Sequence, residues 1–98
     1  MIRVVVQDEN GNEVSEAVDV PARVIARPED HRFSCLRFVD PYGDTVFNSL
    51  QLAALLEDFR LLRDIGDGRE HDAALEQIEV LIERCRARPH LYLKLIGD

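Results

Sequence analysis

The stretch "HLYLKLIGD", residues 90–98, decides the fold that the sequence predicts. Leucine occupies every second position from Leu91 to Leu95, so a strand over residues 90–96 has one wholly aliphatic face. The other face of that strand carries His90, Tyr92, Lys94 and Ile96. An aliphatic strand face must be covered by another apolar element, and the preceding part of the chain supplies a pair of helices.

Two segments before this strand have the apolar period of an amphipathic helix. Residues 49–65 carry apolar side chains at every third or fourth position, and residues 70–88 repeat the pattern. Gly66 and Gly68 separate the two helices, and Pro89 ends the second because it disfavours helical geometry in the residue before it. The short link predicts an antiparallel helical hairpin whose apolar faces match the leucine face of the strand.

Four further segments are predicted to be strands. Residues 2–7 are rich in β-branched side chains, and residues 13–20 form a weaker strand that stops at a proline. Residues 33–39 are apolar on both faces, which is typical of a central strand, and residues 45–47 form a short returning strand. The prediction is a single α+β domain over residues 1–98, with an antiparallel sheet of four or five strands packed on one face by the two-helix hairpin.

The valines fix the register of the first two strands. An Asn-Gly pair is the usual signal of a two-residue hairpin, but that loop would place Val6 opposite a serine. A three-residue loop with Gly11 in the left-handed conformation sets Val6 opposite Val14 instead. The same register sets Ile2 opposite Val18. We therefore predict the three-residue loop.

The segment "DPYGDTVFNSLQ", residues 40–51, is explained for the most part by local structure. Its first four residues predict a tight turn, because proline fixes φ and glycine tolerates a positive φ. Asn48 predicts a helix N-cap, and Gln51 three residues later completes the capping-box pattern.

Charge and composition exclude several classes of partner. With a formal net charge of −7 the chain would repel nucleic acid and anionic membranes. The acidity favours a basic protein partner. The alternative is that the charge only keeps the chain soluble. No signal peptide precedes the first strand and no apolar run could span a bilayer, so we predict a cytoplasmic protein. Cys35 and Cys85 lack metal-binding or redox spacing and are predicted to be buried, reduced thiols.

Catalytic motifs are lacking. The sequence has no nucleophile elbow, no glycine-rich phosphate loop and no zinc-protease motif, and we predict no catalytic residue and no cofactor. Asp40 and Asp44 flank the turn and are weak candidates for ligands of a hard cation. Aspartates at a Pro-Gly turn are more often turn formers.

The polar and aromatic residues of the turn and the last strand predict a protein contact surface. Two helices cover only one face of the sheet, so the second face is left to residues 21–32, to a second copy of the chain or to another protein. Aromatic anchors within a polar rim are typical of protein interfaces. We expect this partner-binding surface to contain Tyr42, Tyr92 and Ile96, with His90 and Lys94 near its rim.

The turn and the tail also carry a family resemblance. The motifs D-P-Y-G-D-T-x-F and H-L-Y-L-K-x-x-G-D resemble those of small bacterial proteins of a kind frequent in actinobacteria. The resemblance implies a common fold, does not extend to residues 1–32, and transfers no catalytic residue because no activity is established for that group.

Two functions of different classes fit these patterns. The first is a non-catalytic acidic protein-binding module, which would act as a regulator, a complex subunit or an immunity-like inhibitor. The alternative is a small-ligand or metal-assisted enzyme that uses Asp40, Asp44 and His90. The missing motifs and the small core favour the binding module.

Overall fold

The computed structural model describes residues 1–66 and 69–98. Its elements are, in order, strand β1 (Ile2–Asp8), strand β2 (Val18–Val20), helix α1 (Ala22–Ile25), 3-10 helix η1 (Leu36–Phe38), strand β3 (Asp44–Phe47), helix α2 (Leu52–Ile65), 3-10 helix η2 (Arg69–His71), helix α3 (Asp72–Arg86) and strand β4 (Leu91–Ile96).

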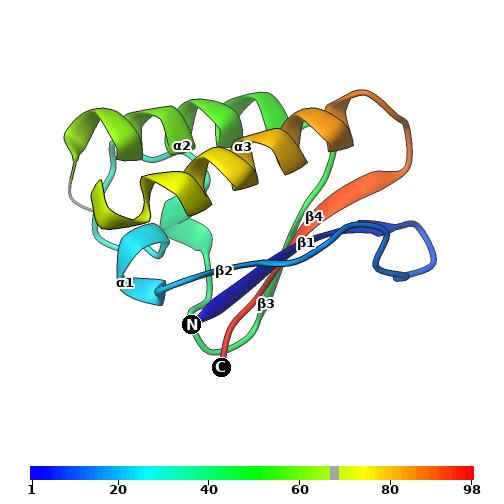
Figure 1. Ribbon diagram of the computed structural model, residues 1–98, viewed down its shortest axis with the longest axis horizontal. Coiled ribbons are helices and arrows are strands. Elements are labelled where there is room, and N and C mark those ends of the chain that lie inside the picture. The colour runs from blue at the N-terminus through cyan, green and yellow to red at the C-terminus, as the bar shows by residue number, and fades with distance from the viewer. Residues whose placement is uncertain (67–68) are drawn as a thin grey trace.

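The strands form one antiparallel sheet in the order β2-β1-β4-β3. The centre of the sheet joins the two ends of the chain, because Arg3 of β1 lies opposite Ile96 of β4. Helices α2 and α3 contact each other and lie together over one face of the sheet (Figure 1). The predicted α+β fold is therefore confirmed. The bounds of three predicted strands, over residues 2–7, 45–47 and 90–96, agree with β1, β3 and β4 to within one residue.

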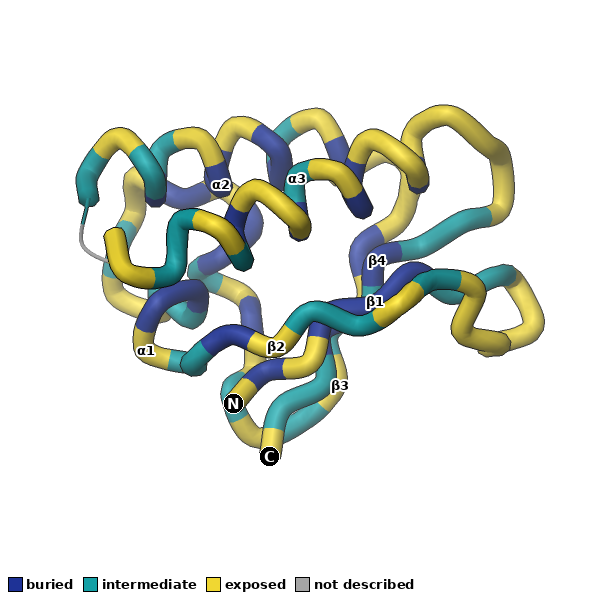
Figure 2. The backbone as a smooth tube through the Cα atoms, viewed as in Figure 1, coloured by how far each residue is buried: buried dark blue, intermediate teal, exposed yellow. Residues whose placement is uncertain are grey.

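The core fills the space between the helical layer and the sheet, where Figure 2 shows the buried residues gathered. Leu93 is fully buried on the sheet side, Leu55 and Phe59 on α2, and Ile78 and Ile82 on α3. The aliphatic face of the last strand is thus the face that the helices cover. Within the described ranges, no helix combines the length and the apolar character needed to cross a membrane.

The predicted strand over residues 33–39 is wrong. The segment forms turns and the short helix η1, and its apolar side chains join the same core. The cause is Asp58 on α2, which is only 3% exposed. Its carboxylate accepts the backbone N–H groups of Ser34 (3.1 Å), Cys35 (2.7 Å) and Leu36 (3.0 Å). Three consecutive amides that converge on one side chain cannot also donate alternately to neighbouring strands.

The predicted strand over residues 13–20 is correct only at its ends. Glu13 makes an isolated bridge to Gln7, and regular pairing resumes only at β2. The predicted three-residue loop is present, since Gly11 has φ +84° and the N–H of Asp8 donates to the carbonyl of Asn12 at 2.9 Å.

Between the bridge and β2 the chain bulges. The hydroxyl of Ser15 accepts the N–H of Val6 at 2.9 Å and takes the place of a backbone carbonyl. Ile2 consequently lies opposite Val20, and the predicted pairing of Ile2 with Val18 is wrong. The shift is an even number of residues, so the valines stay on the core face of the sheet.

Both helices are shorter than predicted. Residues 48–51 form a turn before α2 begins at Leu52, although the predicted capping-box bonds are present. The side-chain oxygen of Gln51 accepts the N–H of Asn48 at 2.9 Å, and the side-chain oxygen of Asn48 accepts the N–H of Leu50 at 3.0 Å.

The link between the helices begins with a left-handed glycine. Gly66 has φ +79° and its N–H donates to the carbonyl of Leu62 at 3.2 Å, which ends α2. Gly68, the second predicted helix breaker, lies outside the described residues. Helix α3 spans Asp72–Arg86 after η2, instead of the predicted residues 70–88.

Residues 21–32 do not cover the second face of the sheet. Val24 and Ile25 of α1 are buried in the same core as Leu93, on the side of the helices. Figure 1 shows α1 at one end of the molecule, between the helical layer and the sheet. The face that carries Tyr92 is therefore not covered by residues 21–32, one of the three possible covers that the sequence leaves open.

Candidate functional site

The tight turn predicted at residues 40–43 is present and is held by the C-terminal tail. The side chain of Asp40 accepts the N–H of Tyr42 at 2.9 Å. From the tail, the N–H of Gly97 donates to the carbonyl of Gly43 at 2.8 Å, and that of Asp98 donates to Pro41 at 3.2 Å. The two motifs that carry the family resemblance thus contact each other and serve the fold.

Gly97 is required by this contact. A Cβ atom at this position would lie 2.4 Å from the carbonyl oxygen of Pro41 and 2.9 Å from the nitrogen of Gly43. Both neighbours are backbone atoms and cannot rotate away. The glycine near the end of the tail motif therefore has a packing role.

The candidate catalytic residues do not come together. Asp44 lies opposite Ile96 in the sheet, with the ammonium of Lys94 at 3.6 Å from its carboxylate. His90 precedes the other end of β4 and lies 3.4 Å from the carboxylate of Glu9. His90 and Ile96 are six positions apart in the sequence, which is about 20 Å along an extended strand. Among residues 1–66 and 69–98, no group of three or more histidine, cysteine or acidic side chains could hold a metal ion.

The two cysteines are buried and free, as the sequence predicts. Burial raises the pKa of the Cys35 thiol, and the nearby Asp58 carboxylate raises it further. Burial also raises the pKa of Cys85, to about 11. Both thiols therefore stay protonated near neutral pH, which makes them poor nucleophiles.

The five predicted partner-binding residues form no single cluster. Tyr92, Lys94 and Ile96 are half-buried on the second face of the sheet. Tyr42 is 82% exposed in the turn beyond the Ile96 end of β4. His90 is exposed at the opposite end of the strand.

Paired charges cover the middle of the second sheet face. The guanidinium of Arg3 donates to both carboxylate oxygens of Glu13, at 2.8 and 2.9 Å. This hydrogen-bonded pair raises the pKa of Arg3 and lowers that of Glu13. Val5, which lies opposite Lys94 in the sheet, is completely buried. The middle of the face is therefore mostly polar, although Val46, which lies opposite Lys94 on the edge strand β3, is 44% exposed.

A cleft lies at the His90 end of this face, and we call it the Leu50 cleft. It has a volume of about 290 Å³ and lies between the turn before α2 and the loop before β4. Its lining residues are Asn48, Ser49, Leu50, Pro89, His90, Leu91 and Tyr92. Leu50 is 90% exposed, the highest value of any large apolar side chain in the described part of the molecule.

His90 gives the cleft its shape. Its φ of +64° is left-handed, which is uncommon for a residue with a side chain and marks a sharp bend after Pro89. Such backbone strain persists where the surrounding structure fixes it, often at binding sites. The sequence pattern indicates His90 and Tyr92 but not Leu50, because the helical period places Leu50 in the predicted helix over residues 49–65.

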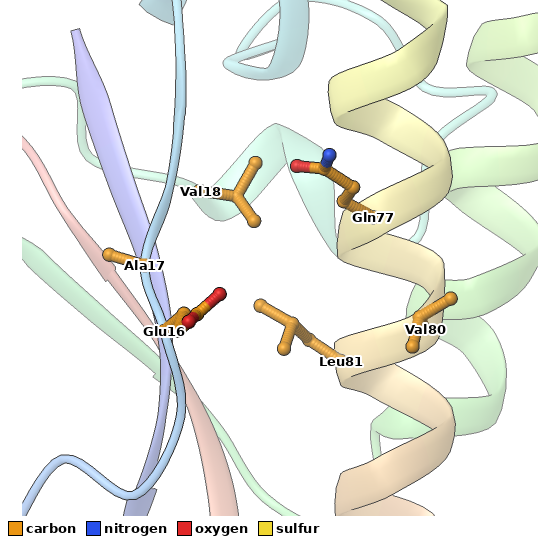
Figure 3. Close-up of a pocket in the computed structure, with 6 residues that line it drawn as sticks. All are labelled: Glu16, Ala17, Val18, Gln77, Val80 and Leu81. Carbon is orange, nitrogen blue, oxygen red and sulfur yellow. The ribbon is translucent and has the colours of Figure 1, made fainter.

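A second groove lies at the opposite edge of the sheet, between α3 and residues 13–20, which we call the β2 segment (Figure 3). We call it the edge groove; its volume is about 310 Å³. It is lined by Glu16, Ala17, Val18, Gln77, Val80 and Leu81. The sequence signal that could have revealed it is Val80, which is 66% exposed and lies outside the apolar stripe of the helix.

Comparison of the chain with protein-family models, curated proteins and solved structures finds no match. The likeness to the actinobacterial group therefore stays a prediction.

Proposed function

We propose that this chain is a non-catalytic, acidic protein-binding module that acts as a regulator, a complex subunit or an immunity-like inhibitor. The observation that carries the proposal is Leu50, an almost fully exposed leucine on the wall of a cleft that also contains Tyr92. Large apolar and aromatic side chains that meet at a concave surface are the usual anchors of protein interfaces.

The local contacts of the three candidate catalytic residues support a binding role over a catalytic one. Asp40 accepts a hydrogen bond inside its own turn, and Asp44 faces Lys94. His90 stands at the other end of the strand, beside Glu9. Each of these groups thus has a local partner, and the distance between the aspartates and the histidine leaves no common place for a substrate.

The proposed contact can extend from the Leu50 cleft along the second face of the sheet. Tyr92 and Ile96 lie four residues apart on β4, which is about 13 Å. A standard interface buries about 800 Å² on each partner, enough to cover both residues and to reach Tyr42. The net charge of −7 favours a partner with a basic surface.

The test compares single variants in affinity capture from the native host. Leu50→Asp and Tyr92→Ala should each reduce the amount of captured partner at least about tenfold, as expected when an interface anchor is lost. Phe38→Ala is the matched control, because Phe38 is 65% exposed and is not among the residues that line the cleft. Equal capture by all three variants would refute the proposed surface.

A second copy of the chain is the simplest partner, since a two-fold axis needs no other protein. Sedimentation velocity of the wild type and of Tyr92→Ala tests this version. The wild type should form a dimer that the variant loses while its melting temperature stays nearly the same. If Tyr92→Ala unfolds the protein, Tyr92 is part of the core and the proposed surface is wrong.

A further inference from the structure

The β2 edge of the sheet has unused backbone hydrogen-bonding groups. The N–H of Val6 donates to Ser15 and its carbonyl accepts from Val14, so both backbone groups of Val6 point toward the β2 segment. These directions alternate along a strand. Val18, which lies opposite Val4, therefore points its backbone N–H and carbonyl toward β1, and Asp19 points its own away from the sheet. Among the described residues, none hydrogen-bonds to the backbone of Asp19.

The edge groove runs beside these free groups. Figure 3 shows the side chains of Val18 and Leu81 pointing into the space between the strand and α3, with Gln77 and Glu16 at its sides. A strand added next to β2 would place every second side chain in this space. The groove therefore offers apolar contacts to alternate residues of an extended segment.

Two acidic side chains lie at this edge, and the arginines near them are bound to other groups. The guanidinium of Arg84 on α3 donates to the backbone carbonyl of Val14 at 2.8 Å. Glu16 and Asp19 are exposed and form no ion pair within the described part of the chain. Arg3 lies opposite Asp19 in the sheet, but its guanidinium is bound by both oxygens of Glu13. A residue that lies opposite Asp19 on an added strand would gain most if it were lysine or arginine.

We propose that the β2 edge and the edge groove bind an extended peptide in which basic and apolar residues alternate. The peptide pairs with Asp19 as an additional strand, its apolar side chains enter the groove beside Leu81, and its basic side chains face Asp19. This is the strand-addition mode of peptide recognition. The inference rests on the proposed protein-binding function, and it adds a second site and the chemistry of its ligand.

A second copy of the chain fits this edge poorly. If two β2 edges paired about a two-fold axis centred on Asp19, the two Asp19 carboxylates would lie directly opposite each other. Like charges at directly opposed positions destabilise strand pairing. The acidic edge thus selects a basic segment and disfavours self-association.

The test uses a capped synthetic peptide in which three valines alternate with lysines, titrated calorimetrically into the full chain. In the predicted pairing, the N–H groups of the lysines point to β2 and those of the valines point away. N-methylation of the lysines should weaken binding about tenfold or more, because hydrogen bonds to β2 are lost. N-methylation of the valines should leave the affinity within about twofold. Equal effects of the two methylations, or no binding of the parent peptide, would overturn the proposal.

Charge-reversal variants test the role of the edge. Glu16→Lys combined with Asp19→Lys should weaken binding of the lysine peptide by about threefold to tenfold and favour a glutamate version. The control combines Glu29→Lys with Asp64→Lys, which changes the net charge equally at exposed sites elsewhere. If the control weakens binding as much, the attraction is nonspecific and the site is refuted.

The two proposals fail separately. Leu50→Asp leaves peptide binding at the edge groove unchanged, because Leu50 is not among the residues of that groove. Loss of partner capture with intact peptide binding supports both sites. If the peptide does not bind but Leu50→Asp abolishes partner capture, the edge groove alone is refuted. If the peptide binds but Leu50→Asp leaves partner capture unchanged, the Leu50 cleft alone is refuted.

Discussion

The carboxylate of Asp58, buried on α2, lies 2.7 Å from the backbone nitrogen of Cys35. This contact joins the middle of a helix to a segment more than twenty residues earlier, and the same carboxylate also binds the amides on either side of Cys35. The Asp58 carboxylate thus takes the backbone hydrogen bonds that residues 34–36 would otherwise donate to a neighbouring strand.

Replacement of Asp58 by alanine should destabilise the protein strongly. Three amide groups lose a charged acceptor, and those of Cys35 and Leu36 are buried, so we expect a loss of about 3–5 kcal/mol in the free energy of unfolding. Urea denaturation measures it. Asp64→Ala on the exposed side of the same helix should change stability by less than about 0.5 kcal/mol. Similar losses in both variants would mean that helix propensity, and not the buried acceptor, matters.

A pair of leucine truncations distinguishes the core from the proposed contact surface. Leu93→Ala removes a fully buried side chain and should cost about 2–5 kcal/mol. Leu50→Ala removes one that is 90% exposed and should leave the unfolding free energy within about 0.5 kcal/mol. Thermal and chemical unfolding check both values, and a large loss for Leu50→Ala would show that the cleft is part of the core.

Gly97→Ala should separate the tail from the turn at residues 41–43. The added methyl group would overlap the carbonyl of Pro41, so the two backbone hydrogen bonds of the tail must break or shift. We expect a loss of about 1–3 kcal/mol and faster hydrogen exchange at Gly97 and Asp98. Asp98→Asn is the control, because it weakens only the exposed ion pair with the N-terminal ammonium, at 2.8 Å. Unchanged exchange in Gly97→Ala would contradict the close packing.

Asp30 should make stability depend on pH in acid. The hydrogen bond from the Arg32 side chain lowers the pKa of Asp30 from its ordinary value of 3.8 to about 2. Because the folded-state pKa is the lower one, the contribution is complete above pH 3.8 and is lost as the pH falls toward about 2. Asp30→Asn should therefore reduce the slope of stability against pH in this window, as measured by urea unfolding at several pH values. Arg32→Gln removes the same hydrogen bonds to Asp30 and should reduce the slope in the same way, and an unchanged slope in both variants would contradict this role.

The sequence predicts the fold wherever periodicity acts alone. The alternation from Leu91 to Leu95 and the stripes of α2 and α3 place the core face correctly, because burial follows directly from apolar spacing. The errors occur where one polar side chain makes a tertiary contact. Asp58 bends residues 33–39, and Ser15 shifts the register of β2.

Periodicity predicts the Leu50 cleft and the edge groove less well than it predicts the core. Tyr92 and His90 line a cleft as well as a strand, but the exposure of Leu50 depends on where α2 begins. The edge groove depends on strand order, which a sequence with four or five possible strands does not determine. Both features follow from the assembly of the whole sheet.

The central position of β1 and β4 also constrains the order of folding. Arg3 and Ile96 are neighbours in the sheet and almost as far apart in the chain as two residues can be, so their pairing closes a very large loop. The contacts between α2 and α3 are close in sequence, so this hairpin can form before the sheet is complete. During synthesis on the ribosome, β1 emerges first and must wait without its central partner until β4 is made. A nascent chain of this protein therefore exposes an unpaired valine-rich strand, and this is the stage at which aggregation and chaperone binding are most expected.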